Sequence, residues 1–164
     1  QLPADLNPGS TKEVRAWLLK LVPQERRQGW QRTSTDELST KGWSTFEWLH
    51  FLRHLPSGLD LGKMSDLDDA FHFTATGNAE IAAAWFEVCI NNDFRKPYAS
   101  MDQFLTQVGR RKFLIPLYTA LARTESGRQE ALTIYKQARP NYHSVSVRTI
   151  DDLLGWEKVS SVSM

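Results

Sequence analysis

The chain has 164 residues, of which 41% are hydrophobic and 24% charged, and its formal net charge is +1 at pH 7. This length is sufficient for one domain with a buried core. The balanced charge argues against broad nucleic-acid binding, which requires a basic excess on one face. No apolar run approaches the roughly 18–20 residues of a membrane span. The single cysteine, Cys89, excludes a disulfide framework within the chain.

The two ends of the chain differ in composition from the part between them. Residues 1–10 are rich in Pro, Gly and polar side chains, which is typical of a linker at a domain boundary. Because the chain starts with Gln rather than Met, we expect it to be a piece of a longer protein, with this linker following a domain that is missing from the sequence. A helical domain is expected over 11–156, and residues 157–164 are expected to fray.

Every element that the sequence predicts is a helix. Ser followed three positions later by Glu or Gln is the pattern in which both side chains satisfy free amides at a helix N-terminus. It occurs at Ser10, Ser34, Ser44 and Ser126, and Asn78 is a fifth expected N-cap. Apolar residues repeat at helical spacing after these caps. In chain order, the expected helices cover 11–22, 34–41, 44–55, 60–72, 79–91, 97–108, 116–124, 127–138 and 146–154.

About nine short helices with short links favour antiparallel pairs stacked in layers. The predicted fold class is therefore all-α, a two-layered α–α superhelix of the armadillo or HEAT kind. No repeat at the periods typical of such solenoids is visible in the sequence, so we expect the repetition in the structure alone.

Charge is most concentrated at the break between two of these helices. Gly109 stands where a helix ending at Val108 would take a left-handed residue. Pro116 suits the first turn of the next helix, and a proline moves the residue before it away from helical angles. We therefore expect 110–115 to form an extended link.

Three consecutive cations, Arg110, Arg111 and Lys112, occupy this link. In an extended segment, alternate residues share a side, so Arg110 and Lys112 would point together and Arg111 would point the opposite way. Two converging cations suit one carboxylate, because Arg offers a flat two-pronged donor and Lys a point charge. The alternative is that the cations only interact with the carbonyls of the preceding helix end, which is worth about 0.3–1 kcal/mol.

Three blocks of sequence resemble the C-terminal helical domain of leukotriene A4 hydrolase and its zinc aminopeptidase (gluzincin) relatives, of the bacterial type. The blocks are 78–90, 107–118 and 131–145, and their order and spacing extend the resemblance over roughly 34–154. The most specific part is Gly-Arg-x-Lys-Phe followed by Pro-Leu. In that family, the helical domain is an α–α superhelix that follows a zinc domain.

The resemblance implies roles for four residues. Arg110 and Lys112 would bind the carboxylate of a short peptide substrate in the active-site cleft, while Gly109 and Pro116 would shape the site. Arg111, at the variable position of the motif, would face solvent. The domain would contact the zinc domain, close the cleft and contribute no catalytic residue. The parent protein would release N-terminal residues from short peptides with zinc-activated water, and epoxide hydrolysis is a second activity in the family. We expect a cytoplasmic location.

The chain itself lacks the His-Glu-x-x-His zinc motif of that family. His50 and His54 are four apart but lack the intervening Glu, so we predict no metal ligand and no cofactor in this chain. The remaining candidates are expected to be structural: Cys89 in the core, His72 and His143 without catalytic partners, Asp66, Asp68 and Asp69 near a helix start, and Trp43 and Trp48 attaching a helix to the core.

A second function, of another class, explains the same features. A free-standing helical-repeat module could bind partner peptides in its concave face, with the cations clamping a peptide terminus. The two hypotheses differ in whether a zinc domain precedes Gln1.

Overall fold

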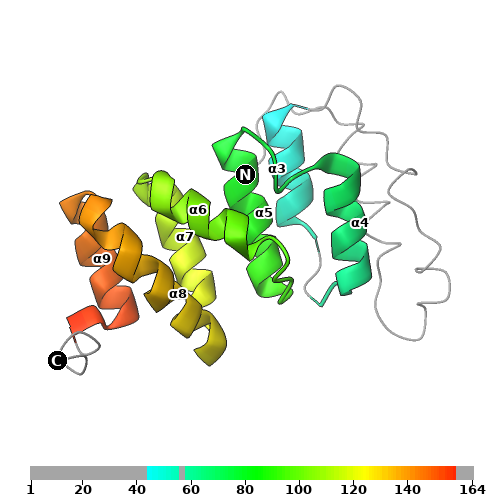
Figure 1. Ribbon diagram of the computed structural model, residues 1–164. Helices are drawn as coiled ribbons and strands as arrows, with labels where there is room; N and C mark the ends of the chain where they lie inside the picture. The colour runs from blue at the N-terminus through cyan, green and yellow to red at the C-terminus, as the bar shows by residue number, and fades with distance from the viewer. Residues whose placement is uncertain (1–43, 56–57, 158–164) are drawn as a thin grey trace. The chain divides into compact units, whose positions relative to one another are not determined.

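The computed structural model describes residues 44–55 and 58–157, and every regular element in this part of the chain is helical (Figure 1). The chain divides into two compact units, Gln1–Phe94 and Arg95–Met164. The first contains α3 (Thr45–Arg53), α4 (Leu61–Phe71) and α5 (Ala79–Asn91), and the second contains α6 (Tyr98–Gln107), α7 (Arg111–Leu121), α8 (Glu125–Ala138), the 3-10 helix η2 (Arg139–Asn141) and α9 (Ser144–Leu154). The helices predicted over 11–22 and 34–41, the caps at Ser10 and Ser34, Trp43, the linker 1–10 and nearly all of the tail lie outside the described residues.

Two of the predicted caps begin helices of the N-terminal unit. The Ser44 hydroxyl accepts a hydrogen bond from the Glu47 amide, and the Glu47 carboxylate accepts one from the Ser44 amide, which is the reciprocal capping box. The Asn78 carboxamide oxygen accepts bonds from the amides of Glu80 and Ile81 and begins α5. Both predicted caps are confirmed. The bonds that make them are local in sequence, so the sequence pattern contains both partners of each bond. The helices they begin, α3 and α5, pack together.

Aromatic rings fill the core of the N-terminal unit. The ring of Trp48 meets the rings of Phe71 and Phe73 edge-on, at centroid distances of 5.0 and 5.5 Å, so Trp48 attaches α3 to the core as predicted. Trp85 is fully buried, and its indole N–H donates to the Thr74 hydroxyl at 2.9 Å. That hydroxyl donates in turn to the Asp68 carboxylate at 2.6 Å. A chain of hydrogen bonds therefore pairs the Trp85 indole, the Thr74 hydroxyl and the Asp68 carboxylate.

The acidic cluster of α4 lies elsewhere than predicted. Asp66, Asp68 and Asp69 occupy the middle and last turn of the helix, so the prediction that they lie near a helix start is wrong. Asp60 is the residue that caps α4, accepting a hydrogen bond from the amide three residues later. Asp68 instead accepts two hydrogen bonds from Thr74, one from its amide and one from its hydroxyl, and so fixes the turn that follows the helix.

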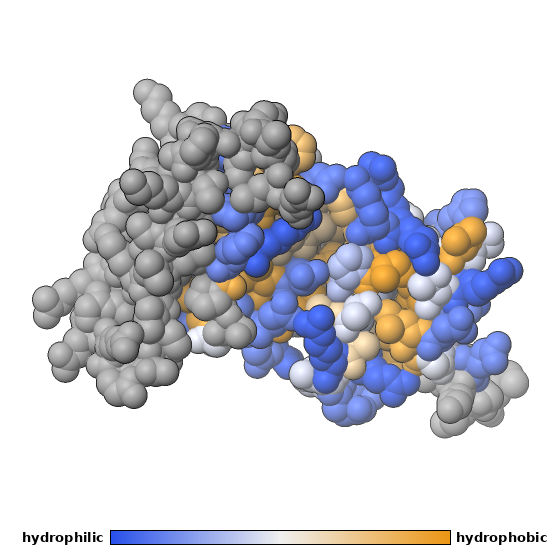
Figure 2. Space-filling view, turned by 180° about the vertical axis from the view of Figure 1, so that it is seen from behind, coloured by the Kyte–Doolittle hydropathy of each residue, from blue (hydrophilic) through white to orange (hydrophobic). Residues whose placement is uncertain are grey.

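The C-terminal unit is built of two layers. Helix α6 packs on α8, and α7 packs on α9, while α8 also contacts both α7 and α9. Its core includes fully buried side chains from all four helices, namely Met101, Leu105, Leu114, Leu117, Tyr118, Leu121, Ala131, Tyr135, Ala138, Ile150 and Leu154. On the face that Figure 2 shows, hydrophobic patches of this unit lie between hydrophilic residues.

Helix α8 starts earlier than the sequence pattern predicts. The expected cap was Ser126, but Thr124 is the N-cap, and its hydroxyl accepts a hydrogen bond from the Gly127 amide at 3.0 Å. The hydroxyl of Ser126 instead accepts a bond from the Arg95 guanidinium at 3.0 Å. Ser and Thr are both good N-caps, so the spacing alone did not distinguish the two positions.

Helix α6 carries a half-buried carboxyl group, that of Asp102, against α8. Desolvation, and then the nearby Glu130, raise the pKa of Asp102 to about 6. One of its oxygens, Oδ1, is buried without a hydrogen-bond partner. An acid whose pKa is raised by folding binds more protons in the folded state, so this group makes the fold less stable as the pH rises from about 4 to 6.

Replacing Asp102 with asparagine should therefore stabilise the chain at pH 7 by about 1 kcal/mol. This free energy is smaller than the full rise in the pKa of Asp102 would give, because the side chain is partly exposed and solvent weakens the effect. Urea unfolding at pH 7 and pH 4 tests this. The gain should disappear at pH 4, where the wild-type carboxyl is already protonated. An equal gain at both pH values would show that titration of Asp102 is not its cause.

Candidate functional site

The predicted cation site lies at the turn between α6 and α7. Helix α6 ends at Gln107, and its C-cap, Val108, has extended angles (φ −100°, ψ 106°). Arg110 is also extended (φ −76°, ψ 122°) and is the N-cap of α7, where its carbonyl accepts the amide hydrogens of Phe113 and Leu114. All three cations, 110–112, are exposed. The turn therefore presents concentrated positive charge at one end of the C-terminal unit.

Gly109 does not adopt the left-handed conformation that we predicted for it. Among the described glycines, positive φ angles occur only at Gly58 and Gly155. A Cβ added at Gly109 would also meet no atom within 4 Å. The extended Val108 ends α6, which removes the need for a left-handed residue. The described fold thus does not require glycine at this position, and the missing side chain leaves open space beside Arg110.

The expectation that 110–115 form an extended link is wrong. Helix α7 starts at Arg111, and Pro116 lies in its second turn on an exposed position. A proline inside a helix costs about 3 kcal/mol. The helix nevertheless runs through it because its inner face, which includes Phe113, Leu114 and Leu117, is buried, and each such side chain contributes roughly 1.5–3 kcal/mol.

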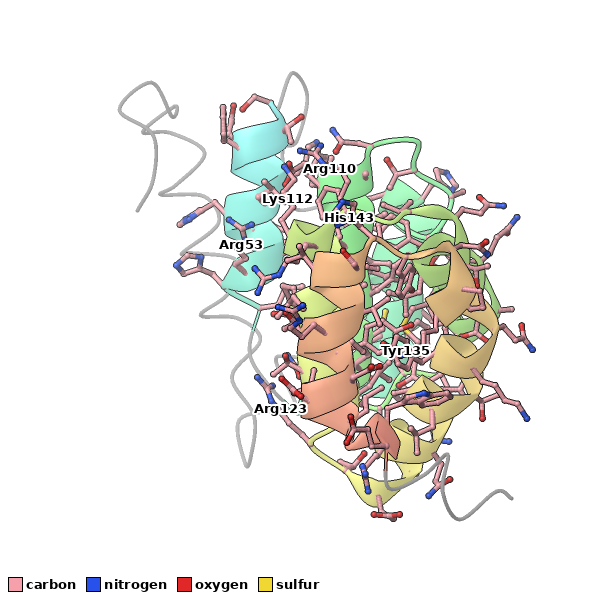
Figure 3. The ribbon with its side chains drawn as sticks, turned by 90° about the vertical axis from the view of Figure 1, so that its left-hand side faces the viewer. Arg53, Arg110, Lys112, Arg123, Tyr135 and His143 are labelled. Atoms are coloured by element: carbon pink, nitrogen blue, oxygen red, sulfur yellow. The ribbon has the colours of Figure 1, made fainter. Side chains whose placement is uncertain are left out.

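Arg110 and Lys112 are brought together by an aromatic ring rather than by an extended backbone. The guanidinium carbon of Arg110 lies 5.8 Å from the centroid of the Phe113 ring, and the ammonium nitrogen of Lys112 lies 5.0 Å from it. Both distances are those of cation–π contacts. Figure 3 shows both cations at the same end of the C-terminal unit, with Arg123 at the opposite end. The structure thus places the two predicted residues on one ring.

Phe113 is a site residue to which the sequence analysis gave no role. It belongs to the Gly-Arg-x-Lys-Phe block and lies in the link expected over 110–115, where only the cations were given roles. Its side chain is only 4% exposed, so it is in the core. The signal that could have identified it is an aromatic residue directly after two cations, because aromatic faces attract cations.

Arg111, between the two cations, points elsewhere. Its guanidinium donates to the Thr149 hydroxyl of α9 at 3.2 Å. It is exposed, as predicted, but it contacts the neighbouring helix of its own layer. The three consecutive cations therefore separate into a pair on the Phe113 ring and a third that contacts α9.

A buried set of tyrosines fixes α6 just before the turn. The Tyr142 hydroxyl donates to the carbonyl of Leu105 in the last turns of α6, and it also hydrogen-bonds the Tyr118 hydroxyl of α7 at 3.0 Å. Burial raises the pKa of Tyr142 to about 12, and burial likewise raises the pKa of Tyr118. Both hydroxyls therefore stay protonated at neutral pH, so each can donate. This network holds α6 and α7 together near the cation turn.

The histidines that the sequence singled out take local structural positions. His143 is the N-cap of α9, where its Nδ1 accepts a hydrogen bond from the Val145 amide, and His72 is the left-handed C-cap of α4. The ring centroids of His50 and His54 lie 4.1 Å apart with an interplanar angle of 47°, and the His54 Nδ1 lies 2.7 Å from the His50 carbonyl. In residues 44–55 and 58–157, no three His, Cys, Asp or Glu side chains are grouped as metal ligands would be.

Cys89 packs in the core as predicted. Its side chain is fully buried, and burial, with a smaller effect of Asp68, raises the pKa of its thiol. A thiol that stays protonated is a poor nucleophile, so the geometry assigns Cys89 to packing. In the described part of the chain, no helix is long and apolar enough to cross a lipid bilayer.

Comparison with known proteins identifies the family. A family model described as "Leukotriene A4 hydrolase, C-terminal" matches residues 43–154. The chain belongs to this family of helical C-terminal domains. A structure of native yeast LTA4 hydrolase superposes with a TM-score of 0.69 over 94% of this chain at 19% identity, so the predicted fold class, an all-α superhelix, is confirmed.

Several aminopeptidases are similar to this chain in sequence. Mouse aminopeptidase B is 23% identical over 159 residues, the human protein of that name 26% over 141, and leucine aminopeptidase 2 of Neurospora crassa 22% over 144. The alignments cover 92%, 81% and 88% of this chain but only 23%, 20% and 21% of those proteins. The chain spans 28% of the yeast structure. It therefore spans between 20% and 28% of the length of these relatives.

Proposed function

We propose that this chain is the domain that closes the active-site cleft of a zinc aminopeptidase, and that Arg110 and Lys112 bind the C-terminal carboxylate of a short peptide there. The observation that carries the proposal is the placement of both cation tips over the single Phe113 ring, at 5.8 and 5.0 Å. Membership of the leukotriene A4 hydrolase C-terminal family and similarity to aminopeptidases support it.

The chemistry of the two cations suits a terminal carboxylate. A guanidinium donates two parallel hydrogen bonds to a carboxylate, and an ammonium adds a third from another direction. Each such bond contributes about 1.5–3 kcal/mol when water is excluded. The open space at Gly109 gives a carboxylate room to approach the backbone beside Arg110. Holding the peptide by its far end would place its N-terminal peptide bond at a fixed distance, so the anchoring would support catalysis as well as binding.

The part of the chain that the structure describes offers no site for the zinc ion of such an enzyme. The sequence contains no His-Glu-x-x-His, and the described residues hold no group of three metal-capable side chains. The zinc domain would be the intramolecular partner of this chain and would supply the metal chemistry. Epoxide hydrolysis and a cytoplasmic location remain predictions from the family resemblance.

The test compares two tripeptides that differ only at the C-terminus, one with a free carboxylate and one with an amide. In the full-length protein that carries this domain, kcat/KM for release of the N-terminal residue should be at least about tenfold higher for the free acid, the effect of one charge-assisted hydrogen bond. Equal values would contradict the carboxylate site.

Whether a zinc domain precedes this chain is tested by sequencing the DNA that encodes it. The DNA upstream of the Gln1 codon should encode an in-frame His-Glu-x-x-His with a downstream Glu. A start codon immediately before Gln1 would instead leave the free-standing peptide-binding module as the function to test.

A further inference from the structure

The Phe113 ring is unusual in contacting two cations while being almost completely buried. Its side chain is 4% exposed, whereas Arg110 and Lys112, whose charged ends lie over it, are both exposed. A buried ring below exposed cations is a fixed surface on which flexible side chains can rest.

Two like charges close together repel each other, and Arg and Lys side chains have many rotamers. A carboxylate that binds both must first bring their tips together, and immobilising such side chains weakens binding. The face of an aromatic ring carries negative electrostatic potential, so it attracts both cations and partly offsets their repulsion. A ring below the pair therefore lowers the cost of assembling the site before the substrate arrives.

The ring is itself held by both helices that flank the turn. Phe113 lies in the first turn of α7. Phe104 of α6 meets its ring at a centroid distance of 6.0 Å with an interplanar angle of 60°, an edge-to-face contact. The backbone of one helix and an aromatic ring of the other thus fix where the two cations can rest.

We propose that Phe113 is the positioning residue of the carboxylate site, because it holds the Arg110 guanidinium and the Lys112 ammonium where one terminal carboxylate can bind both. The proposal rests on the function proposed above for the two cations. Phe113 does not touch the substrate and acts only through the side chains above it.

The experiment replaces Phe113 with leucine in the full-length protein that carries this domain. The measured quantity is kcat/KM for a tripeptide with a free C-terminal carboxylate divided by kcat/KM for its C-terminal amide. Leucine keeps an apolar side chain in the core but removes the ring. The ratio should fall about tenfold, as expected when two exposed cation–π contacts are lost.

Three further variants separate positioning from packing. Phe113→Tyr keeps the ring and should keep the wild-type ratio to within about twofold, since a phenol face also attracts cations. Phe86→Leu is the matched control. Phe86 lies in α5 of the other unit and is 2% exposed, so this variant makes the same substitution in a different core. It should lower thermal stability without changing the ratio. Phe113→Met provides a second ring-free variant if the leucine variant does not fold.

Each outcome decides between the two proposals. A reduced ratio in both ring-free variants, with an unchanged ratio in Phe113→Tyr and Phe86→Leu, supports positioning by the ring. An unchanged ratio in Phe113→Leu, while Arg110→Ala lowers it, overturns the positioning role and leaves the carboxylate site intact. If neither Phe113→Leu nor Arg110→Ala changes the ratio, the carboxylate site is wrong and the positioning role fails with it.

Discussion

Replacing Arg110 with alanine in the full-length protein should lower kcat/KM for a tripeptide with a free C-terminal carboxylate by at least about tenfold. The alanine variant loses a two-pronged, charge-assisted hydrogen bond to the substrate, worth roughly 1.5–3 kcal/mol, and each 1.36 kcal/mol corresponds to about a factor of ten in rate. Arg110 is an exposed N-cap without a side-chain cap bond, so its removal should leave α7 folded.

The matched control is Arg111→Ala, which removes the same side chain one residue later. Arg111 contacts Thr149 of α9 and not the Phe113 ring, so this variant should keep kcat/KM within about twofold of wild type. Steady-state kinetics with both tripeptides measures the two effects. If kcat/KM fell equally in both variants, the local positive charge would explain the loss, and a specific hydrogen bond from Arg110 to the substrate would not.

The largest expected effect on stability comes from the polar contact that joins α8 to α9. Arg139 donates to both oxygens of Asp151, from Nε at 2.9 Å and from Nη2 at 2.7 Å. The Tyr135 hydroxyl lies 2.5 Å from the same carboxylate and 3.1 Å from the Val147 carbonyl. Replacing Asp151 with alanine should lower the free energy of unfolding by about 2 kcal/mol at pH 7, a value reduced because the side chain of Arg139 is 36% exposed.

The pH dependence of this loss follows from the lowered pKa of Asp151. Hydrogen bonds from Arg139 are the largest cause, and they favour the charged carboxylate in the folded state. An acid with a lowered folded pKa stabilises the fold above its ordinary pKa of about 4, and this contribution is lost as the pH falls through the folded value. Urea unfolding should therefore show a full difference between wild type and Asp151→Ala at pH 7, which shrinks below about pH 4.

The exposed neighbour Asp152 provides the control for this experiment. Asp152→Ala changes the same charge on the same helix and should alter the free energy of unfolding by no more than about 0.5 kcal/mol. If Asp152→Ala destabilises as much as Asp151→Ala, the net charge of α9 would explain the loss, and the contact with Arg139 would not.

Helix positions in the described residues were largely predictable because their signals are local. The caps at Ser44 and Asn78 bond to amides two or three residues away, so the sequence pattern already contains both partners. The helix predicted over 79–91 matches the bounds of α5, where a cap and an unbroken apolar stripe agree. The all-α fold class follows from the same signals repeated along the chain.

The cation pair was predicted for a reason that the structure does not bear out. The expected extended link around Arg110 and Lys112 relied on Pro116 as a helix boundary, which is a local rule. Burial of the inner face of α7 against the other helices of its unit outweighs that rule, so the helix starts five residues before the proline. The spacing argument therefore singled out two residues that share one ring, but it assumed the wrong backbone geometry for them.

The sequence by itself determined the all-α fold class, the caps at Ser44 and Asn78 and the identity of the exposed cations, because each depends on residues within one or two helical turns. Only the tertiary structure decided that Pro116 lies inside a helix and that Arg110 and Lys112 rest on Phe113. Those features depend on which apolar side chains are buried together, including Phe104 against Phe113, and the free energy of that burial comes from contacts between helices.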